Sequence, residues 1–182
     1  PPSDDLLTGE LAGRPVVFLP RHGRNHALLP SEINHRANLY ALKELGVERI
    51  LAWSGPGSLD THRFHPGEFV LPHDLLDQTR NRPGTFFAGR GWGFIRSHPT
   101  FCPRLREALG RSLTSAGTPW HDGGVYVCTE GPRLETAAEV RAFAAWGGDL
   151  VGMTLAPEAF LAREPEICYA PLCYLTNYAA GV

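Results

Sequence analysis

The sequence lacks three features that would each define a class of protein. No run of residues approaches the roughly 18 apolar residues that a membrane-spanning helix needs. The N-terminal stretch 1–5 has neither the basic start nor the apolar core of a signal peptide. The net charge is −2, without the basic excess of a nucleic-acid-binding protein. We therefore expect a cytoplasmic protein whose partners are small molecules, with no nucleic-acid or membrane partner.

Cysteine is sparse, and no C-x-x-C pair occurs among Cys102, Cys128, Cys168 and Cys173. Three of them, Cys128, Cys168 and Cys173, lie in apolar runs that favour strands, which is typical of small buried side chains. A zinc site would need cysteines clustered more tightly with histidine. We expect no metal, buried thiols and a reducing compartment.

What the chain does contain is enough apolar sequence for a core, since 43% of its 182 residues are hydrophobic. The length suits one domain. Short apolar runs predict strands and 3.6-residue periodicity predicts helices, in alternation. The predicted strands are 15–19, 49–53, 68–72, 124–129, 150–152 and 167–175, and the predicted helices are 31–45, 103–116, 157–163 and one that begins after the capping box Thr136–Glu139. Residues 74–103 show little periodicity and predict an irregular functional or interface segment.

Polar residues follow almost every predicted strand. In α/β folds with buried strands, ligands gather at the carboxyl ends of those strands. Arginine, histidine, hydroxyls and loop amides together can hold an oxyanion, and a carboxylate beside an amide can bind the edge of a heterocycle. The segments are Arg21-His22, Ser54-Gly55, Glu130 to Glu135, Gly152 to Thr154 and Thr176-Asn177. We expect the sheet order to bring them together.

Four segments resemble the trimeric purine nucleoside phosphorylase and methylthioadenosine phosphorylase family. They are Phe18-Leu-Pro-Arg-His-Gly-Arg-Asn-His26, Pro30-Ser-Glu-Ile-Asn-His-Arg-Ala-Asn38, Glu130-Gly-Pro-Arg-Leu-Glu-Thr136 and Val151-Gly-Met-Thr-Leu-Ala-Pro-Glu158. The resemblance implies a single-domain, three-layer α/β/α fold with a mixed, partly barrel-like central sheet. It also implies a homotrimer or a dimer of trimers.

The family cleaves the N-glycosidic bond of purine nucleosides with inorganic phosphate, giving free purine and a sugar 1-phosphate for purine salvage. The resemblance implies that phosphate is a co-substrate and that no metal or organic cofactor takes part. It implies phosphate binding by Arg21, His22, Ser54, Gly55 and Thr154, purine or ribose contacts by Leu134, Glu135, Met153 and Asn177, and catalytic roles for Glu135 and Asn177.

Base preference follows from the polarity of the purine edge. A 6-oxopurine presents N1–H as a donor, which an ionised Glu135 accepts, whereas a 6-aminopurine presents a bare N1. Relatives that prefer 6-aminopurines have a Thr-Asp-Tyr-Asp run, and this chain has Thr176-Asn177-Tyr178-Ala179. We predict a preference for inosine, guanosine or 5′-methylthioinosine.

Some features depart from the family pattern. Pro56 removes one amide donor from the Ser54-Gly55 loop. Relatives also begin with a strand and a Gly-rich loop and end with a further helix, which we expect this sequence to lack. Two alternatives therefore stay open: a methylthioadenosine phosphorylase, and a non-catalytic nucleoside- or phosphate-binding oligomer on the same fold.

Overall fold

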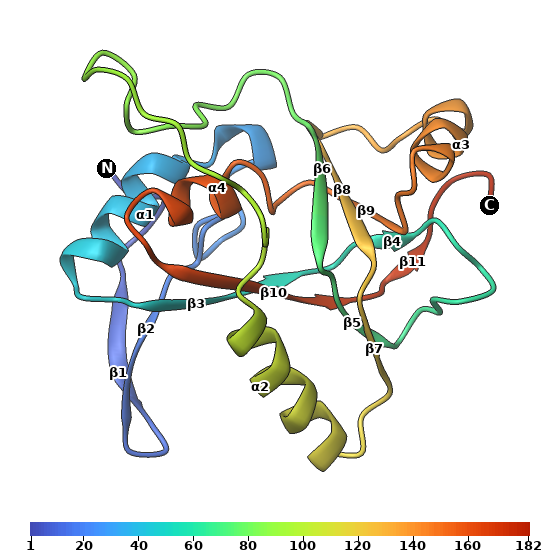
Figure 1. Ribbon diagram of the computed structural model, residues 1–182, viewed down its shortest axis with the longest axis horizontal. Coiled ribbons are helices and arrows are strands. Elements are labelled where there is room, and N and C mark those ends of the chain that lie inside the picture. The colour runs from blue at the N-terminus through green and yellow to red at the C-terminus, as the bar shows by residue number, and fades with distance from the viewer.

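Two sheets and one hairpin hold the strands of the computed structural model, which describes residues 1–182 (Figure 1). The strands are β1 (Leu7–Leu11), β2 (Arg14–Phe18), β3 (Arg49–Ser54), β4 (Gly57–Ser58), β5 (Phe69–Leu71), β6 (Asp74–Gln78), β7 (Trp120–Asp122), β8 (Val125–Thr129), β9 (Leu150–Gly152), β10 (Cys168–Tyr174) and β11 (Asn177–Tyr178). The helices are α1 (His35–Glu44), α2 (Pro103–Ser115), α3 (Ala137–Ala145) and α4 (Glu158–Arg163), with a 3₁₀ turn at Pro30–Glu32.

Parallel and antiparallel pairs mix in both larger sheets. The first has the order β3-β10-β5-β7, in which β10 runs parallel to β3 and antiparallel to β5. The second has the order β11-β4-β9-β8-β6, in which β9 runs parallel to β8 and antiparallel to β4. Helices α1 and α4 lie on one side of β3 and β10, and α2 lies on the other (Figure 1). The predicted α/β fold with a mixed sheet is confirmed.

Strand β10 runs through the main core because helices cover both of its faces. Its sequence is apolar almost throughout, and Tyr169, Ala170 and Cys173 are buried. Their neighbours in the core include Phe64, Phe101, Tyr126, Leu150, Leu155 and Leu161. A second cluster, which includes Val127, Val140 and Phe143, packs α3 against the five-stranded sheet. No helix is both long enough and apolar enough to cross a membrane.

Most predicted elements are found within a few residues of their expected bounds. The first helix begins at His35 rather than at residue 31, because the Asn34 side chain caps it by accepting from the Ala37 amide. The predicted capping box is confirmed: the Thr136 hydroxyl accepts from the Glu139 amide, and the Glu139 carboxylate accepts from the Thr136 amide. The prediction for 74–103 is wrong at its start, where β6 pairs in parallel with β8.

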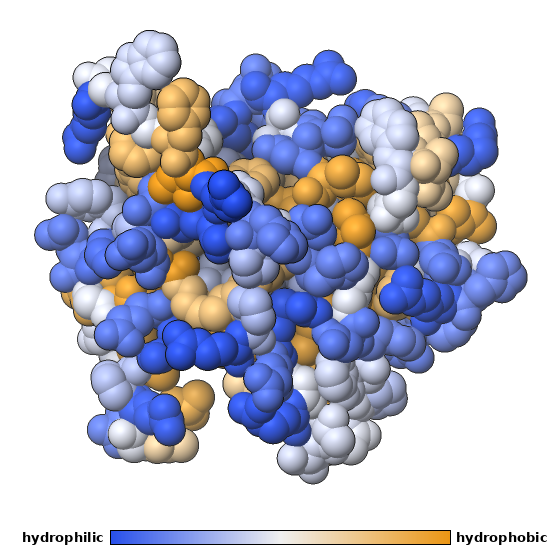
Figure 2. All heavy atoms as spheres, viewed as in Figure 1, coloured by the Kyte–Doolittle hydropathy of each residue, from blue (hydrophilic) through white to orange (hydrophobic).

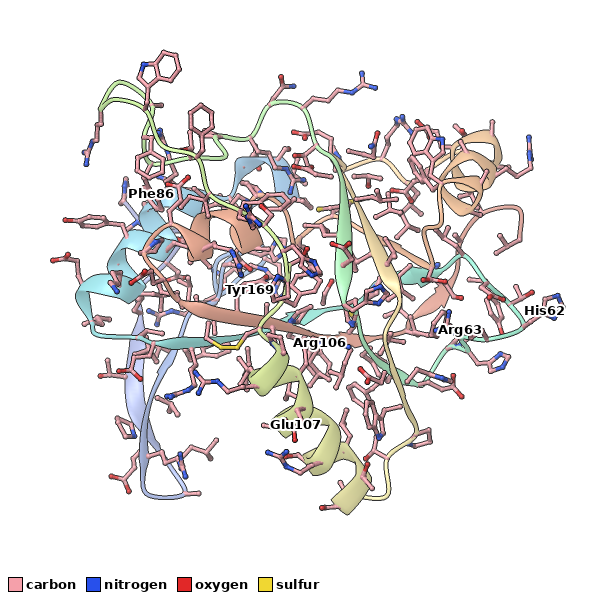
Figure 3. All side chains as sticks on the ribbon, in the orientation of Figure 1. His62, Arg63, Phe86, Arg106, Glu107 and Tyr169 are labelled. Carbon is pink, nitrogen blue, oxygen red and sulfur yellow. A yellow bond between two sulfur atoms is a disulfide. The ribbon has the colours of Figure 1, made fainter.

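The prediction of buried thiols is wrong for Cys168. Cys102 and Cys168 form a disulfide, with Cα atoms 5.4 Å apart across 66 residues of sequence, and the yellow bond in Figure 3 marks it beside α2 and β10. The Cys102 amide donates to the Tyr169 carbonyl at 2.8 Å, which fixes the start of α2 against β10. Cys128 and Cys173 are buried and free, as predicted. The expectation of a reducing compartment was based on free cysteines, and the disulfide removes that basis.

Candidate functional site

The five residues predicted to bind phosphate lie around one cavity. Its volume is about 1140 Å³, and Arg21, His22, Ser54, Gly55 and Thr154 all contribute to its lining. They come from the loop after β2, the end of β3 and the loop after β9. The cavity also extends along the apolar groove between β2 and β3. The fold therefore brings together residues that are up to 133 positions apart in the sequence. The expectation that sheet order does this is wrong, because β2, β3 and β9 belong to the hairpin, the four-stranded sheet and the five-stranded sheet, and the packing of these three parts places the residues around one cavity.

Two hydroxyl groups of the cavity wall, those of Ser54 and Thr154, form a hydrogen-bonded group with the buried Tyr126 hydroxyl behind them. Ser54 Oγ lies 3.0 Å from the Tyr126 hydroxyl and 3.0 Å from Thr154 Oγ1. Burial raises the pKa of the Tyr126 hydroxyl, so this group stays protonated at neutral pH. Ser54 ends β3, Tyr126 lies in β8, and Thr154 lies two residues after the end of β9. Tyr126 was not predicted as a site residue because Tyr126 lies inside a strand rather than after its end.

The Arg21 guanidinium is held in place by acceptors on two sides. Nη1 donates to Glu158 Oε2 at 2.9 Å, and Nη2 donates to the Trp53 carbonyl at 2.6 Å. Burial acts to lower the pKa of Arg21, but the charge of Glu158 and the nearby Tyr169 outweigh it and raise that pKa. The side chain is 13% exposed. Arg21 thus remains a cation whose orientation is set before any ligand binds.

His22 presents a defined tautomer to the cavity. Its Nδ1 lies 3.0 Å from the Leu28 carbonyl oxygen, which can only accept, so Nδ1 carries the proton. Burial lowers the pKa of His22, and the adjacent Arg21 cation lowers it further, against the effect of the Leu28 hydrogen bond. The imidazole is therefore neutral at pH 7, and its Nε2 is an acceptor. A neutral His22 can accept a hydrogen bond from a protonated oxygen of the monohydrogen phosphate ion.

A buried histidine lies behind the arginine. His35 Nδ1 is 3.9 Å from Glu158 Oε1, and neither ring nitrogen of His35 has a hydrogen-bond partner. Burial lowers the pKa of His35 to about 4, although the carboxylate of Glu158 acts in the opposite direction. Glu158 also accepts a hydrogen bond from the Tyr169 hydroxyl at 2.6 Å. Sequence analysis assigned none of these three residues to the site, although Glu158 ends one of the segments quoted above.

The residues predicted to bind purine lie on strand ends of the five-stranded sheet. Glu135, in the loop between β8 and α3, accepts a hydrogen bond from the Thr129 hydroxyl at 2.5 Å. Met153 follows β9, and its sulfur would lie 2.5 Å from a Cβ atom at Gly131, whose φ is 67°. Only glycine fits at residue 131 unless Met153 moves. Leu134 is 76% exposed, so its side chain is free to contact a ligand.

Asn177 lies on β11, which pairs with β4, the neighbour of β9. Its amide nitrogen donates to the Tyr178 carbonyl at 2.7 Å, and its oxygen accepts from the Thr176 hydroxyl at 2.7 Å. None of Leu134, Glu135, Met153 and Asn177 lines the large cavity. The structure therefore gathers the residues predicted to bind phosphate around one cavity, and it places the residues predicted to bind purine outside that cavity.

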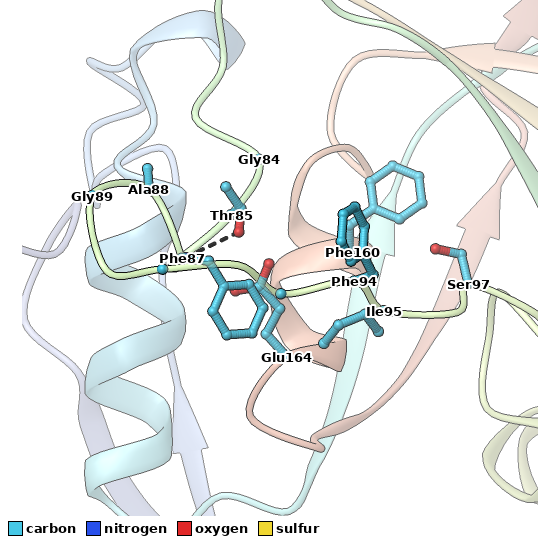
Figure 4. Close-up of a pocket in the computed structure, with 12 residues that line it drawn as sticks. Gly84, Thr85, Phe87, Ala88, Gly89, Phe94, Ile95, Ser97, Phe160 and Glu164 are labelled. Carbon is cyan, nitrogen blue, oxygen red and sulfur yellow. Dashed lines mark hydrogen bonds between the residues drawn. The ribbon is translucent and has the colours of Figure 1, made fainter.

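A second cavity of about 460 Å³ lies under the loop 84–97 (Figure 4). Phe87, Phe94 and Phe160 surround it, and Glu164 accepts a hydrogen bond from the Phe86 amide at its edge. It contains none of the predicted site residues. No group of three or more His, Cys, Asp or Glu side chains in the structure is arranged to hold a metal ion.

Comparison with known proteins identifies the family to which the chain is similar. The family model described as "Phosphorylase superfamily" matches residues 1–182. The chain is 48% identical to 6-oxopurine nucleoside phosphorylase of Pyrococcus furiosus, over 97% of this chain and 69% of the relative. It is 45% identical to S-methyl-5′-thioadenosine phosphorylase of Thermofilum pendens, over 98% of this chain and 68% of the relative.

A solved structure gives the same result for the fold. A methylthioadenosine phosphorylase from an antarctic soil metagenomic library superimposes with a TM-score of 0.96 at 41% identity. The match covers 98% of this chain and 63% of the other, so this chain spans less than two thirds of that protein's length. The family model and these relatives show that the chain belongs to the phosphorylase superfamily, in the branch of purine nucleoside and methylthioadenosine phosphorylases.

Proposed function

We propose that the protein cleaves the N-glycosidic bond of purine nucleosides with inorganic phosphate. The observation that carries this proposal is the convergence of Arg21, His22, Ser54 and Thr154 on one cavity. These groups supply a fixed cation, a neutral imidazole acceptor and hydroxyl donors. Such a set matches the monohydrogen phosphate ion, which has charged oxygens and one protonated oxygen. The relatives named above are phosphorylases by name.

The chemistry separates charge across the bond that breaks. Glycosidic cleavage passes through an oxocarbenium-like state, with positive charge on the sugar and negative charge on the departing base. The bound phosphate dianion stabilises the sugar cation and attacks the anomeric carbon. The C–N bond electrons leave with the purine. The products are a sugar 1-phosphate and the free base.

The leaving base needs groups that bind it more strongly as it becomes negative. We assign Glu135 to purine N1–H and Asn177 to purine N7. The Thr129 hydroxyl donates to Glu135 Oε1, which leaves Oε2 to accept from N1–H. In the absence of ligand, the Asn177 side-chain amide donates to the Tyr178 carbonyl. When purine binds, this hydrogen bond is replaced by one from the same amide to purine N7. Leu134 and Met153 supply the apolar contacts to base and sugar in this assignment.

Within the purines, we propose a preference for 6-oxopurines. Asn177 and Ala179 are neutral at the two positions where 6-aminopurine-specific relatives have aspartate. The similarity to S-methyl-5′-thioadenosine phosphorylase of Thermofilum pendens keeps methylthioadenosine as the second candidate substrate.

The test is to measure release of base from inosine, guanosine, methylthioinosine and methylthioadenosine, each with and without phosphate. We expect phosphate-dependent release from the first three and weak release from the fourth. Faster turnover of methylthioadenosine would refute the base preference alone. Tight binding of nucleoside without any release of base would refute phosphorolysis and favour a binding protein.

We also propose a homotrimer, or a dimer of trimers, in the cytoplasm. The loop 84–97 exposes Trp92 by 93% and Phe94 by 88%, and Figure 2 shows hydrophobic atoms gathered at the upper left, where this loop lies. Exposed apolar patches of this kind mark contact surfaces. Light scattering tests the assembly, and a monomer in solution would contradict the proposed trimer.

The cytoplasmic location is proposed because nucleosides and phosphate are cytoplasmic metabolites, and cell fractionation tests it.

A further inference from the structure

Arg82 is a buried cation in the segment between β6 and α2. Its side chain is 1% exposed, the lowest value of any arginine in an ion pair of this protein. The nearest carboxylate oxygen, Glu130 Oε2, lies 3.5 Å from its Nε, and that Nε has no hydrogen-bond partner. A buried charge costs free energy unless many groups satisfy it. The contacts of its two other nitrogens account for its stability there.

Both terminal nitrogens of Arg82 donate to main-chain carbonyls of two different loops. Nη1 donates to the carbonyl oxygens of Met153 and Ala156, both at 2.7 Å. Nη2 donates to those of Thr129 at 3.2 Å and Glu130 at 2.6 Å. One guanidinium thus ties the loop after β8 to the loop after β9. The planar arrangement of its donors permits this, and the ammonium group of a lysine cannot reproduce it.

These two loops carry the groups assigned above to both substrates. The loop after β8 leads from Thr129 to Glu135, and the loop after β9 holds Met153 and Thr154. Their relative position fixes the separation between the purine contacts and the phosphate contacts. A displacement of about 1 Å at such a position can cost roughly 100-fold in rate.

We propose that Arg82 is a positioning residue that fixes the purine-binding loop relative to the phosphate-binding loop. This assignment rests on the proposed function for the identity of the two substrates. Arg82 does not touch either substrate in this assignment, since both of its terminal nitrogens donate to main-chain carbonyls and its side chain is 1% exposed. Arg82 acts through the two loops. Its loss therefore affects kcat together with the KM for nucleoside and the KM for phosphate.

The experiment compares Arg82→Met and Arg82→Lys with a matched control, Arg163→Met. Arg163 also donates to three main-chain carbonyls, those of Arg96, His98 and Pro99, but it lies in no part of the assigned site. For each variant we would measure kcat, both KM values, the thermal unfolding midpoint and amide hydrogen exchange. Arg82→Lys keeps the charge and serves as the second variant if Arg82→Met does not fold.

We expect kcat/KM for nucleoside to fall about 100-fold in both Arg82 variants and to stay unchanged in Arg163→Met. We also expect faster exchange at 129–136 and 153–157 in the Arg82 variants alone. Unchanged exchange in these loops, or an activity loss equal to that of Arg163→Met, would overturn the proposal. If the unaltered protein releases no base with phosphate, the proposed function fails, and the exchange data still decide the role of Arg82.

Discussion

The Glu158 carboxylate accepts a hydrogen bond from the Arg21 guanidinium at 2.9 Å, and the two side chains are 6% and 13% exposed. This pair fixes the direction of the cation at the phosphate cavity. Because the carboxylate is anionic, it also lowers the net positive charge that the ligand experiences. Glu158 therefore fixes the orientation of the Arg21 guanidinium and weakens its attraction for an anionic ligand.

Replacing Glu158 by glutamine tests that relationship. The variant Glu158→Gln keeps one acceptor oxygen but loses the charge, and hydrogen bonds to charged groups contribute about 1.5–3 kcal/mol. We expect the KM for phosphate to rise about tenfold, with a smaller change in the KM for nucleoside. Steady-state kinetics at varied phosphate measure this. The control is Glu107→Gln, a carboxylate that is 70% exposed and does not line the phosphate cavity; equal kinetics in both variants would contradict the assignment.

His35 predicts a pH dependence of stability. Burial lowers its pKa in the folded state to about 4, against an unfolded value of 6.5, despite Glu158 and with a further lowering by Arg82 and Arg21. The unfolded chain therefore binds more protons between these values, and stability falls as pH decreases from about 6.5 to about 4. The loss from this group is at most about 3 kcal/mol.

Denaturant unfolding of the unaltered protein and of His35→Gln at pH 7, 6, 5 and 4 measures this contribution. We expect the free energy of unfolding to fall more steeply with acid in the unaltered protein than in the variant. Parallel curves for the two proteins would show that His35 does not titrate as its burial requires.

Asn177 is predicted to stabilise the departing base. Removing a donor that acts on developing negative charge costs about 10²-fold in rate. We expect Asn177→Ala to lower kcat for inosine by about that factor, with little change in the KM for phosphate. The double variant Asn177→Asp with Ala179→Asp should shift preference toward methylthioadenosine. Full activity of Asn177→Ala on inosine would exclude Asn177 from catalysis.

The disulfide between Cys102 and Cys168 predicts a redox dependence of stability. A cross-link across 66 residues removes chain entropy from the unfolded state, which the loop-closure model puts at about 4 kcal/mol. We expect Cys102→Ser with Cys168→Ser, or a reducing agent, to lower the thermal unfolding midpoint. Cys128→Ser is the control for a change of a buried thiol. If reducing agent has no effect on the midpoint, then the cross-link does not form in solution.

The strand-end loops of the site could be predicted from sequence because each follows a short apolar run. Arg21, Ser54 and Thr154 were found in this way, and the structure places them around one cavity. Such prediction of the loops depends only on local periodicity. Their meeting at one cavity depends on how the hairpin and the two larger sheets pack, which local periodicity does not show. Their roles as ligands remain predictions.

Other parts of the site could not be predicted because they depend on contacts between distant residues. Arg82 lies in a stretch without periodicity, and its partners are main-chain carbonyls 47 to 74 positions away. Because every residue has a main-chain carbonyl, the residue types in the sequence do not identify these partners. The pairing of Cys102 with Cys168 likewise depends on how α2 meets β10. Strand β6 escaped prediction because it is an edge strand with polar residues at both ends.

The chain of hydroxyls from Tyr126 through Ser54 to Thr154 has a direction as well as a length. Each hydroxyl has a single proton, and two contacts link the three groups, so one proton is left over at one end. Tyr126 is fully buried, and its hydroxyl contacts Ser54 and Thr154, so its proton is directed at one of these two groups. The spare proton therefore belongs to Ser54 or Thr154, both of which line the cavity. A ligand that arrives as an acceptor finds this proton already directed at the cavity, so the wall favours hydrogen-bond acceptors such as the oxygens of a phosphate ion.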